Sequence, residues 1–121
     1  MERQTKNATI KSTQLGGGDR GIMTSWVTVD YGGMEQGFGG FRLDSYDKQS
    51  NKCTPNICLA IWVQEILRVL EVSEWEKLKG TPIRVRCKDD SWSSPIVAIG
   101  HYLKDKWFEP EVAFFQRWED K

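Results

Sequence analysis

The sequence predicts a single α+β domain with a mainly antiparallel sheet, one long apolar helix and short helices. Three observations lead to this class. The chain has 121 residues, which suits one ordinary domain. Strand-like segments stand on both sides of one central segment that is apolar at helical spacing. Because strands and helices do not alternate along the chain, we expect an antiparallel sheet and treat residues 1–121 as one domain.

Three segments in the first third of the chain have the pattern of strands, because apolar and β-branched residues alternate with polar ones between glycine turns. Glycines in the third of them weaken it and permit a bulge or the close approach of another backbone or a ligand. Trp26 in the second segment and Trp62 in the helix lie within predicted core elements, so we expect both to pack inside. The three segments are residues 7–14, 22–30 and 35–43.

The central part of the chain predicts the long apolar helix. Residues 44–54 are polar without a periodic apolar signal and predict a loop. Thr54 and Pro55 have the residue types of a helix N-cap and first helical position. From Ile57 to Leu70 the helix is apolar on nearly all sides. Such a helix needs more cover than so short a chain supplies, so we expect a second subunit to cover it.

The last third predicts strands between two short helices. Ser73 and Glu76 have the spacing of a capping box, which predicts a short helix over 73–79. Residues 110–121 predict a C-terminal helix and tail, because Pro110 suits the start of a helix. The strands between them are residues 83–88 and 95–103.

Charge and composition exclude several classes of partner. Lys plus Arg is 17 and Asp plus Glu is 17, so no net field draws the chain onto long nucleic acid. No stretch approaches the roughly 18 apolar residues that span a bilayer, and the N-terminus has no apolar signal region, so we expect a cytoplasmic protein without membrane contact. The three cysteines lack the spacing of a zinc site. We therefore expect free thiols, no metal and no cofactor.

Two glycine-rich segments are candidates for ligand contact. Gly16, Gly18 and Gly21 have the spacing of a dinucleotide-binding turn, but that turn needs a helix after it and a strand follows here. A plain hairpin loop and a ligand-touching loop both stay open. In the segment QGFGGF, backbone N–H groups at Phe38 and Gly39 suit a phosphate beside a base, and a bulge or a packing role is equally compatible.

The sequence favours binding over catalysis. His101 is the one histidine, and no Ser, Cys or carboxylate stands at a spacing that implies a triad. We therefore do not expect an enzyme. Trp92 lies in a polar turn, and Trp107 follows closely after Lys104. Each tryptophan suits a pocket where an indole stacks on a purine and a neighbouring cation meets phosphate.

Several segments, in this order, resemble small bacteriophage proteins of the type one Thoeris anti-defence family. They are NATIKSTQLGGGDRGIMTSWVTVDYGG, EQGFGGFRLD, ILRVLEVSEWEKLKG, PIRVR and IGHYLKDKWFEP, from about residue 7 to 110. The phrases QGFGG, VLEV, WEKLKG and IG-x-x-x-K-D-x-W-F carry most of the resemblance. It implies a viral protein that binds cyclic ADP-ribose isomers made by TIR-domain enzymes without cleaving them, and so acts as a sponge for an immune signal.

The resemblance also implies how the protein is assembled and where it acts. The family forms homodimers, and trimers of dimers capture cyclic trinucleotides, the signals of the CBASS system, at a second site. The protein would act in the cytoplasm of an infected bacterial cell. The polar residues 44–54 and the stretch before Ser73 have no counterpart in the family, so specificity could differ there.

The resemblance and the residue types together give two sets of candidate ligand residues. Aromatic side chains would contact base or ribose, cations would contact the pyrophosphate, and His101 would contact a ribose hydroxyl. His101 stands where the family commonly has an asparagine, which changes the hydrogen-bonding geometry. The cyclic ADP-ribose set is Phe38, Gly39, Arg42, Trp92, His101, Lys104, Trp107 and Arg117, and the cyclic trinucleotide set is Arg68 and Arg84.

Two other functions stay open at this point. A phosphodiesterase or hydrolase with His101 as base would degrade the same ligands and leave products. A protein–protein inhibitor would use exposed aromatic residues against a host protein and would carry no cyclic nucleotide.

Overall fold

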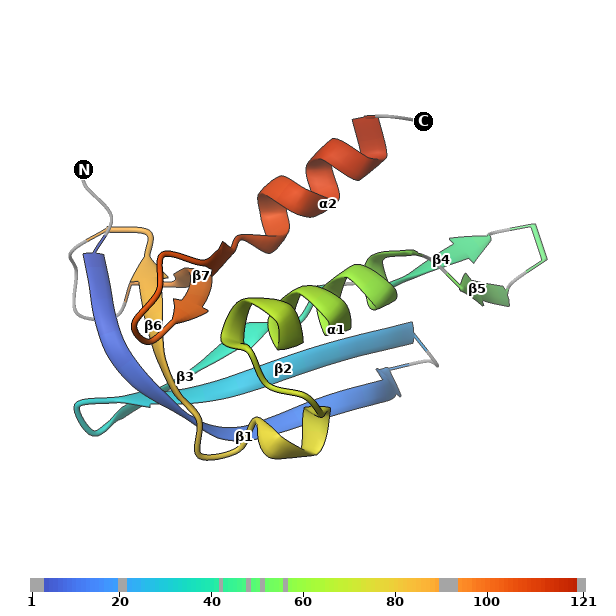
Figure 1. The fold of residues 1–121 in the computed structure, drawn as a ribbon. Coiled ribbons are helices and arrows are strands. Elements are labelled where there is room, and N and C mark those ends of the chain that lie inside the picture. The colour runs from blue at the N-terminus through green and yellow to red at the C-terminus, as the bar shows by residue number, and fades with distance from the viewer. Residues whose placement is uncertain are drawn as a thin grey trace.

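The protein is described from a computed structural model that covers residues 4–19, 22–41, 43–47, 49–50, 52–55, 57–89 and 94–119. Its main body is a six-stranded antiparallel sheet. Figure 1 shows that the long first strand bends, so that the sheet curves around the central helix. Across the sheet the strands are β3 (Met34–Gly39), β2 (Ile22–Tyr31), β1 (Gln4–Asp19), β6 (Pro82–Cys87), β7 (Ile96–His101) and β8 (Trp107–Phe108).

This architecture confirms the predicted α+β class and the antiparallel sheet. Strands that are neighbours in the sheet also follow one another along the chain, except β1 and β6, between which two other strands of the sheet and the central helix intervene. The first strand is longer than predicted. It continues through the glycine run to Asp19, which pairs with Ile22 after an irregularity in the ladder.

The central helix is shorter than expected. Helix α1 (Ile57–Leu70) has 14 residues, an ordinary length for a globular protein. Thr54 and Pro55 do not start it, because they belong to strand β5 (Lys52–Pro55), which pairs with β4 (Asp44–Asp47). The prediction of a loop over 44–54 is therefore wrong. The backbone ladder of a hairpin needs no apolar alternation, so this polar sequence gave no strand signal.

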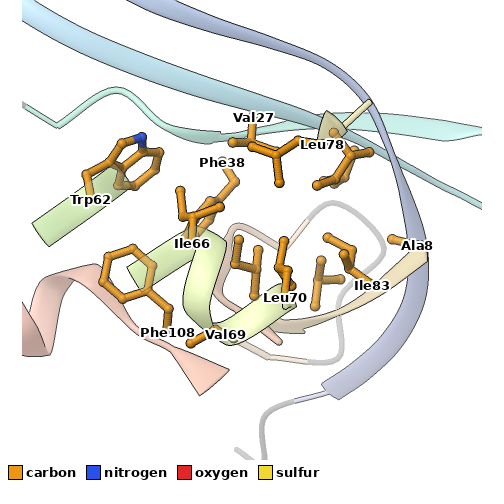
Figure 2. Close-up of a cluster of buried hydrophobic side chains, with 14 of the residues drawn as sticks. Ala8, Val27, Phe38, Trp62, Ile66, Val69, Leu70, Leu78, Ile83 and Phe108 are labelled. Carbon is orange, nitrogen blue, oxygen red and sulfur yellow. The ribbon is translucent and has the colours of Figure 1, made fainter. Parts of the chain in front are cut away.

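The core lies between α1 and the concave face of the sheet, as the close-up in Figure 2 shows. Trp62 and Ile66 of α1 are fully buried, which confirms the predicted interior position of Trp62. The Trp62 ring stacks on Phe38 with centroids 5.4 Å apart. Burying one large apolar side chain stabilises a fold by about 1.5–3 kcal/mol. The largest fully buried side chains are Trp62, Phe38, Phe114, Ile10, Leu43, Ile66, Leu78, Ile83, Ile99, Val27, Val29 and Val85.

Trp26 is not in the core. Its side chain is 45% exposed, while Val27 on the opposite side of strand β2 is fully buried. Alternation along β2 places these two side chains on opposite faces of the sheet. Small residues in β3 and just after it leave room for a large side chain on the outer face. A Cβ at Gly37 would lie 2.9 Å from the Trp26 ring, and one at Gly40 would lie 2.3 Å from it. The glycines therefore make room for an indole on the outer face, which is one reason for the glycine-rich third strand.

Helix α1 ends at Leu70 in a Schellman motif. The N–H of Val72 donates to the carbonyl of Leu67 at 3.0 Å, and the N–H of Glu71 donates to the carbonyl of Arg68 at 3.3 Å. Glu71 adopts the left-handed conformation with φ 56°, at the position where glycine is usual. It is the single non-glycine residue with positive φ in the described parts of the chain.

The segments after α1 differ in detail from the prediction. The short helix expected over 73–79 is one 3-10 turn, η1 (Trp75–Lys77), whose N-cap is Glu74 without a side-chain capping bond. The capping box predicted from Ser73 is therefore wrong. The C-terminal helix is confirmed as α2 (Pro110–Glu119). The Phe114 ring of α2 packs edge-on against Phe41, with centroids 5.6 Å apart, and so holds α2 against the core.

Candidate functional site

The structure distributes the predicted ligand residues between the core, one corner of the sheet and the outer face of α1. Arg42 and Trp92 lie outside the described residues, as does the side chain of Arg117. The described residues of the two sets are Phe38, Gly39, His101, Lys104, Trp107, Arg68 and Arg84.

Phe38 and Gly39 serve the core. Phe38 is 2% exposed and stacks on Trp62, so its ring has no free face for a base. A Cβ at Gly39 would lie 2.4 Å from the Ser25 carbonyl oxygen and 2.9 Å from the Trp62 ring. Gly39 also has φ 127°, which side chains rarely allow. Close packing on Trp62 accounts for both residues, and the burial of the Phe38 ring contradicts its assignment to a ligand pocket.

Four predicted residues come together where strand β7 turns into β8. We call His101, Lys104, Trp107 and Arg84, with their contacts Glu71, Lys106 and Arg86, the β7–β8 corner. Arg84 holds the turn together. Its Nε donates to the His101 carbonyl oxygen at 2.9 Å and its Nη2 donates to the Lys104 carbonyl oxygen at 2.8 Å.

The carboxylate of Glu71 is the centre of charge in the β7–β8 corner. Lys104 Nζ lies 2.8 Å from its Oε2 and donates to its Oε1 at 2.9 Å. Lys106 Nζ lies 3.4 Å from the same Oε2, and His101 Nε2 lies 3.5 Å from it. The hydrogen bond from Lys104 lowers the pKa of Glu71 below its ordinary value, and Lys106 adds to this effect. One carboxylate thus faces three basic side chains.

Both ring nitrogens of His101 are engaged. Nδ1 accepts hydrogen bonds from the backbone N–H groups of Leu103 and Lys104, whose nitrogens each lie 3.0 Å away, so this nitrogen is assigned without a proton. Nε2 faces Glu71, and the side chain is 18% exposed. In this arrangement the imidazole orders the turn, and its ring offers no unengaged nitrogen to act as a general base.

Trp107 lies over the backbone of strand β7. A Cβ at Gly100 would lie 2.5 Å from the indole Cε3, so only glycine fits beneath the ring. The guanidinium carbon of Arg86 lies 3.8 Å from the ring centroid and that of Arg84 lies 5.0 Å from it. The indole Nε1 donates to Asp105 Oδ1 at 3.0 Å. The indole is therefore an ordered platform that carries guanidinium groups.

Sequence reasoning missed three residues of this corner. Arg86 had a signal, because alternation in Ile83-Arg-Val-Arg86 places Arg84 and Arg86 on one face of the strand. Lys106 also had a signal, because it stands two residues after Lys104 and directly before Trp107. Glu71 had no local signal, since its contact with Lys104 joins positions 33 residues apart.

The two residues predicted for the cyclic trinucleotide site, Arg68 and Arg84, lie in different places. Arg84 is held in the β7–β8 corner, whereas the side chain of Arg68 is 72% exposed and pairs with Glu65. The backbone carbonyl of Arg68 accepts a hydrogen bond from Lys106 Nζ at 2.9 Å, which ties the end of α1 to the corner. Arg68 also borders an open groove of about 720 Å³ between α1 and α2, lined by Ile61, Gln64, Glu65, Leu67, Arg68, Val72 and Ala113.

Two further observations limit the chemistry. Within the described part of the chain, no three His, Cys, Asp or Glu side chains are grouped so that they could hold a metal ion. None of the described helices is long and apolar enough to cross a membrane.

The fold and the corner define a small antiparallel α+β domain with a surface cluster of basic and aromatic side chains. Comparisons with protein-family models, with curated proteins and with solved structures gave no match.

Proposed function

We propose that this protein binds cyclic ADP-ribose isomers made by TIR-domain enzymes and sequesters them without cleavage. A cyclic ADP-ribose carries a purine, two riboses and a pyrophosphate. Such a ligand needs a flat apolar partner and several cations within a few ångströms of one another. The observation that carries the proposal is the β7–β8 corner, where the Trp107 indole meets the guanidinium groups of Arg84 and Arg86, and the ammonium groups of Lys104 and Lys106 meet the carboxylate of Glu71.

The roles within the corner follow from which groups remain available. Arg84 is committed to two carbonyl oxygens, so it positions the turn. Arg86 contacts the Trp107 ring at 3.8 Å through the face of its guanidinium, and among the described residues none accepts a hydrogen bond from its N–H groups, which would meet a phosphate oxygen. Lys104 and Lys106 supply point charges for the pyrophosphate, and His101 contacts a ribose hydroxyl through its Nε2.

The sequence motifs support the same ligand class. Residues Ile99 to Phe108 form the phrase IG-x-x-x-K-D-x-W-F, one of the phrases in which the chain resembles the type one Thoeris anti-defence proteins of bacteriophages. This phrase comprises part of β7, the turn and all of β8. The protein would then act as an immune-evasion factor in the cytoplasm of an infected bacterial cell, and without an enzymatic step.

We also propose that the active form is a homodimer, or a trimer of dimers. Helix α1 leaves apolar surface uncovered, because Ile57 is 46% exposed and Ile61 and Leu67 line the open groove. A second subunit on this face would bury that surface and close pockets shared between subunits. Arg68 at the groove would serve the cyclic trinucleotide site of the larger assembly. Light scattering of the purified protein measures the assembly directly.

The test is co-expression with a TIR-domain enzyme, followed by purification, heat denaturation and mass spectrometry of the released small molecules. Intact cyclic ADP-ribose supports the proposal, and linear products would show a phosphodiesterase instead. If no nucleotide is released after repeated co-expression, a protein–protein inhibitor becomes the better explanation.

Calorimetry then assigns the site. Sequestration needs a dissociation constant well below the signal's concentration, and a nanomolar value corresponds to about −12 kcal/mol. Arg86→Ala and Lys104→Ala should each weaken binding at least about tenfold, which is about 1.4 kcal/mol. Lys11→Ala is the matched control, because Lys11 also forms an exposed ion pair, with Glu35, between strands β1 and β3. Equal affinity of all three variants would remove the ligand from this corner.

A further inference from the structure

The cations of the β7–β8 corner already surround one anion, the carboxylate of Glu71. Lys104, Lys106 and His101 all face its Oε2, at 2.8, 3.4 and 3.5 Å. Two of these residues come from the turn after β7, and Glu71 comes from the end of α1. A carboxylate and a phosphate present oxygen atoms of the same kind to such donors. Glu71 thus stands where an oxyanion from a ligand would bind.

The backbone at Glu71 does not explain why a glutamate is present. The residue ends α1 with φ 56°, a conformation that glycine adopts without steric cost and other residues do not. The backbone hydrogen bonds of this helix end involve only main-chain atoms. What the glutamate adds is its carboxylate among the three basic groups, at the expense of backbone strain.

The ion pairs of Glu71 with Lys104 and Lys106 are exposed to water, so another anion can replace Glu71 in them. The side chains of Glu71, Lys104 and Lys106 are 38%, 60% and 37% exposed, so water reaches all of them. Ion pairs at such exposed positions are weak, because water competes for both charges. A diphosphate carries more negative charge than one carboxylate and more acceptor oxygens, so it competes well for the same donors.

We infer that Lys104 and Lys106 form an oxyanion site for a phosphate group, that Glu71 is a built-in competitor that occupies this site until a phosphate displaces it, and that the displacement frees His101 Nε2 for the neighbouring ribose hydroxyl. This inference rests on the proposed function for the identity of the ligand, whose pyrophosphate would be the displacing group. Glu71 would thereby select against ions of low charge, since only a ligand with other contacts or more charge gains enough to displace it.

Binding of inorganic pyrophosphate to Glu71 variants, measured by calorimetry at low ionic strength, tests the inference. Glu71→Gln should bind pyrophosphate about fivefold more tightly than the unaltered protein, because the competing charge is gone and the shape is kept. Glu71→Gly should show the same gain, and it stays folded because glycine suits the left-handed conformation. Glu65→Gln is the matched control, since Glu65 also pairs with a basic residue of the helix, Arg68.

The outcomes separate the two proposals. If both Glu71 variants bind pyrophosphate no more tightly than the unaltered protein, or if Glu65→Gln shows the same gain, the oxyanion site is refuted. In that case the binding of cyclic ADP-ribose is still judged by its own experiment. If both Glu71 variants gain affinity for pyrophosphate and no variant binds cyclic ADP-ribose, the oxyanion site stands and the proposed function fails. If adding Lys104→Ala to the Glu71→Gln variant removes the gain in affinity for pyrophosphate, that gain depends on Lys104.

Discussion

Replacing Gly100 by alanine places a methyl group under the indole of Trp107. The added Cβ would lie 2.5 Å from the ring Cε3 and 2.8 Å from the Lys106 carbonyl oxygen. The carbonyl is fixed by a hydrogen bond from the His101 N–H at 3.0 Å, so the indole has to move. A displacement of about 1 Å would restore an ordinary contact distance. It would also disturb the contact of Arg86 with the ring.

The magnitude follows from three contributions. Forcing extra volume into packed surroundings costs about 1–3 kcal/mol. Weakening a cation–π contact adds about 0.5–1 kcal/mol. Alanine itself favours the strand over glycine by about 0.5–1 kcal/mol, which offsets the second contribution. The variant should therefore unfold with a free energy lower by about 1–3 kcal/mol, or a Tm lower by roughly 4–12 °C.

Thermal unfolding by circular dichroism measures this loss, with Gly32→Ala as the control. Gly32 has φ 65° with no atom within 4 Å of an added Cβ, so the control should lose only about 1 kcal/mol. Gly100→Ala should also weaken ligand binding, whereas Gly32→Ala should not. A Gly100→Ala protein with unchanged Tm and unchanged near-ultraviolet dichroism would refute the proposed packing of Trp107.

Three further predictions concern the stability of the fold at low pH, the packing of Trp62 in the core and the reactivity of the Cys87 thiol. Because the pKa of Glu71 is lowered in the folded protein, its ion pairs stabilise the fold above about pH 4.5 and are lost as the pH falls below that value. The difference in unfolding free energy between the unaltered protein and Glu71→Gln should thus be constant at neutral pH and vanish in acid, and a constant difference at all pH values would contradict this. Trp62→Ala should destabilise the fold by about 3–5 kcal/mol, because the ring is fully buried, and urea unfolding measures it; a loss below about 1 kcal/mol would be inconsistent with this core. Burial raises the pKa of the Cys87 thiol, so its alkylation in the folded protein should be much slower than after unfolding, and equal rates would contradict its position.

Local sequence patterns predicted most of the fold. Alternation predicted strand β2 and put Val27 and Trp26 on opposite faces, and helical spacing predicted the helix whose Trp62 and Ile66 lie in the core. Which face of β2 is buried was predicted wrongly, because the aromatic character of Trp26 suggested burial. The β4–β5 hairpin gave no signal, because its stability comes from backbone pairing of polar residues.

The candidate site was less predictable, because its contacts join distant parts of the chain. The family resemblance pointed to His101, and the aromatic and cationic residue types pointed to Trp107 and Lys104. Glu71 could not be found in this way, since nothing near it in the sequence indicates the cations that it meets. Phe38 was assigned to a ligand because glycines surround it, whereas those glycines provide space for indole rings.

The pairing of tryptophan with glycine has a consequence for how the sequence can change. Trp26 fits over Gly37 and Gly40, and Trp107 fits over Gly100, so each ring fills the volume that a neighbouring strand leaves empty. Neither partner can be replaced by a residue of different size alone without a gap or a collision. A smaller residue in place of the tryptophan should be tolerated when the glycine beneath it is replaced by a larger residue, so the two positions would have to change together.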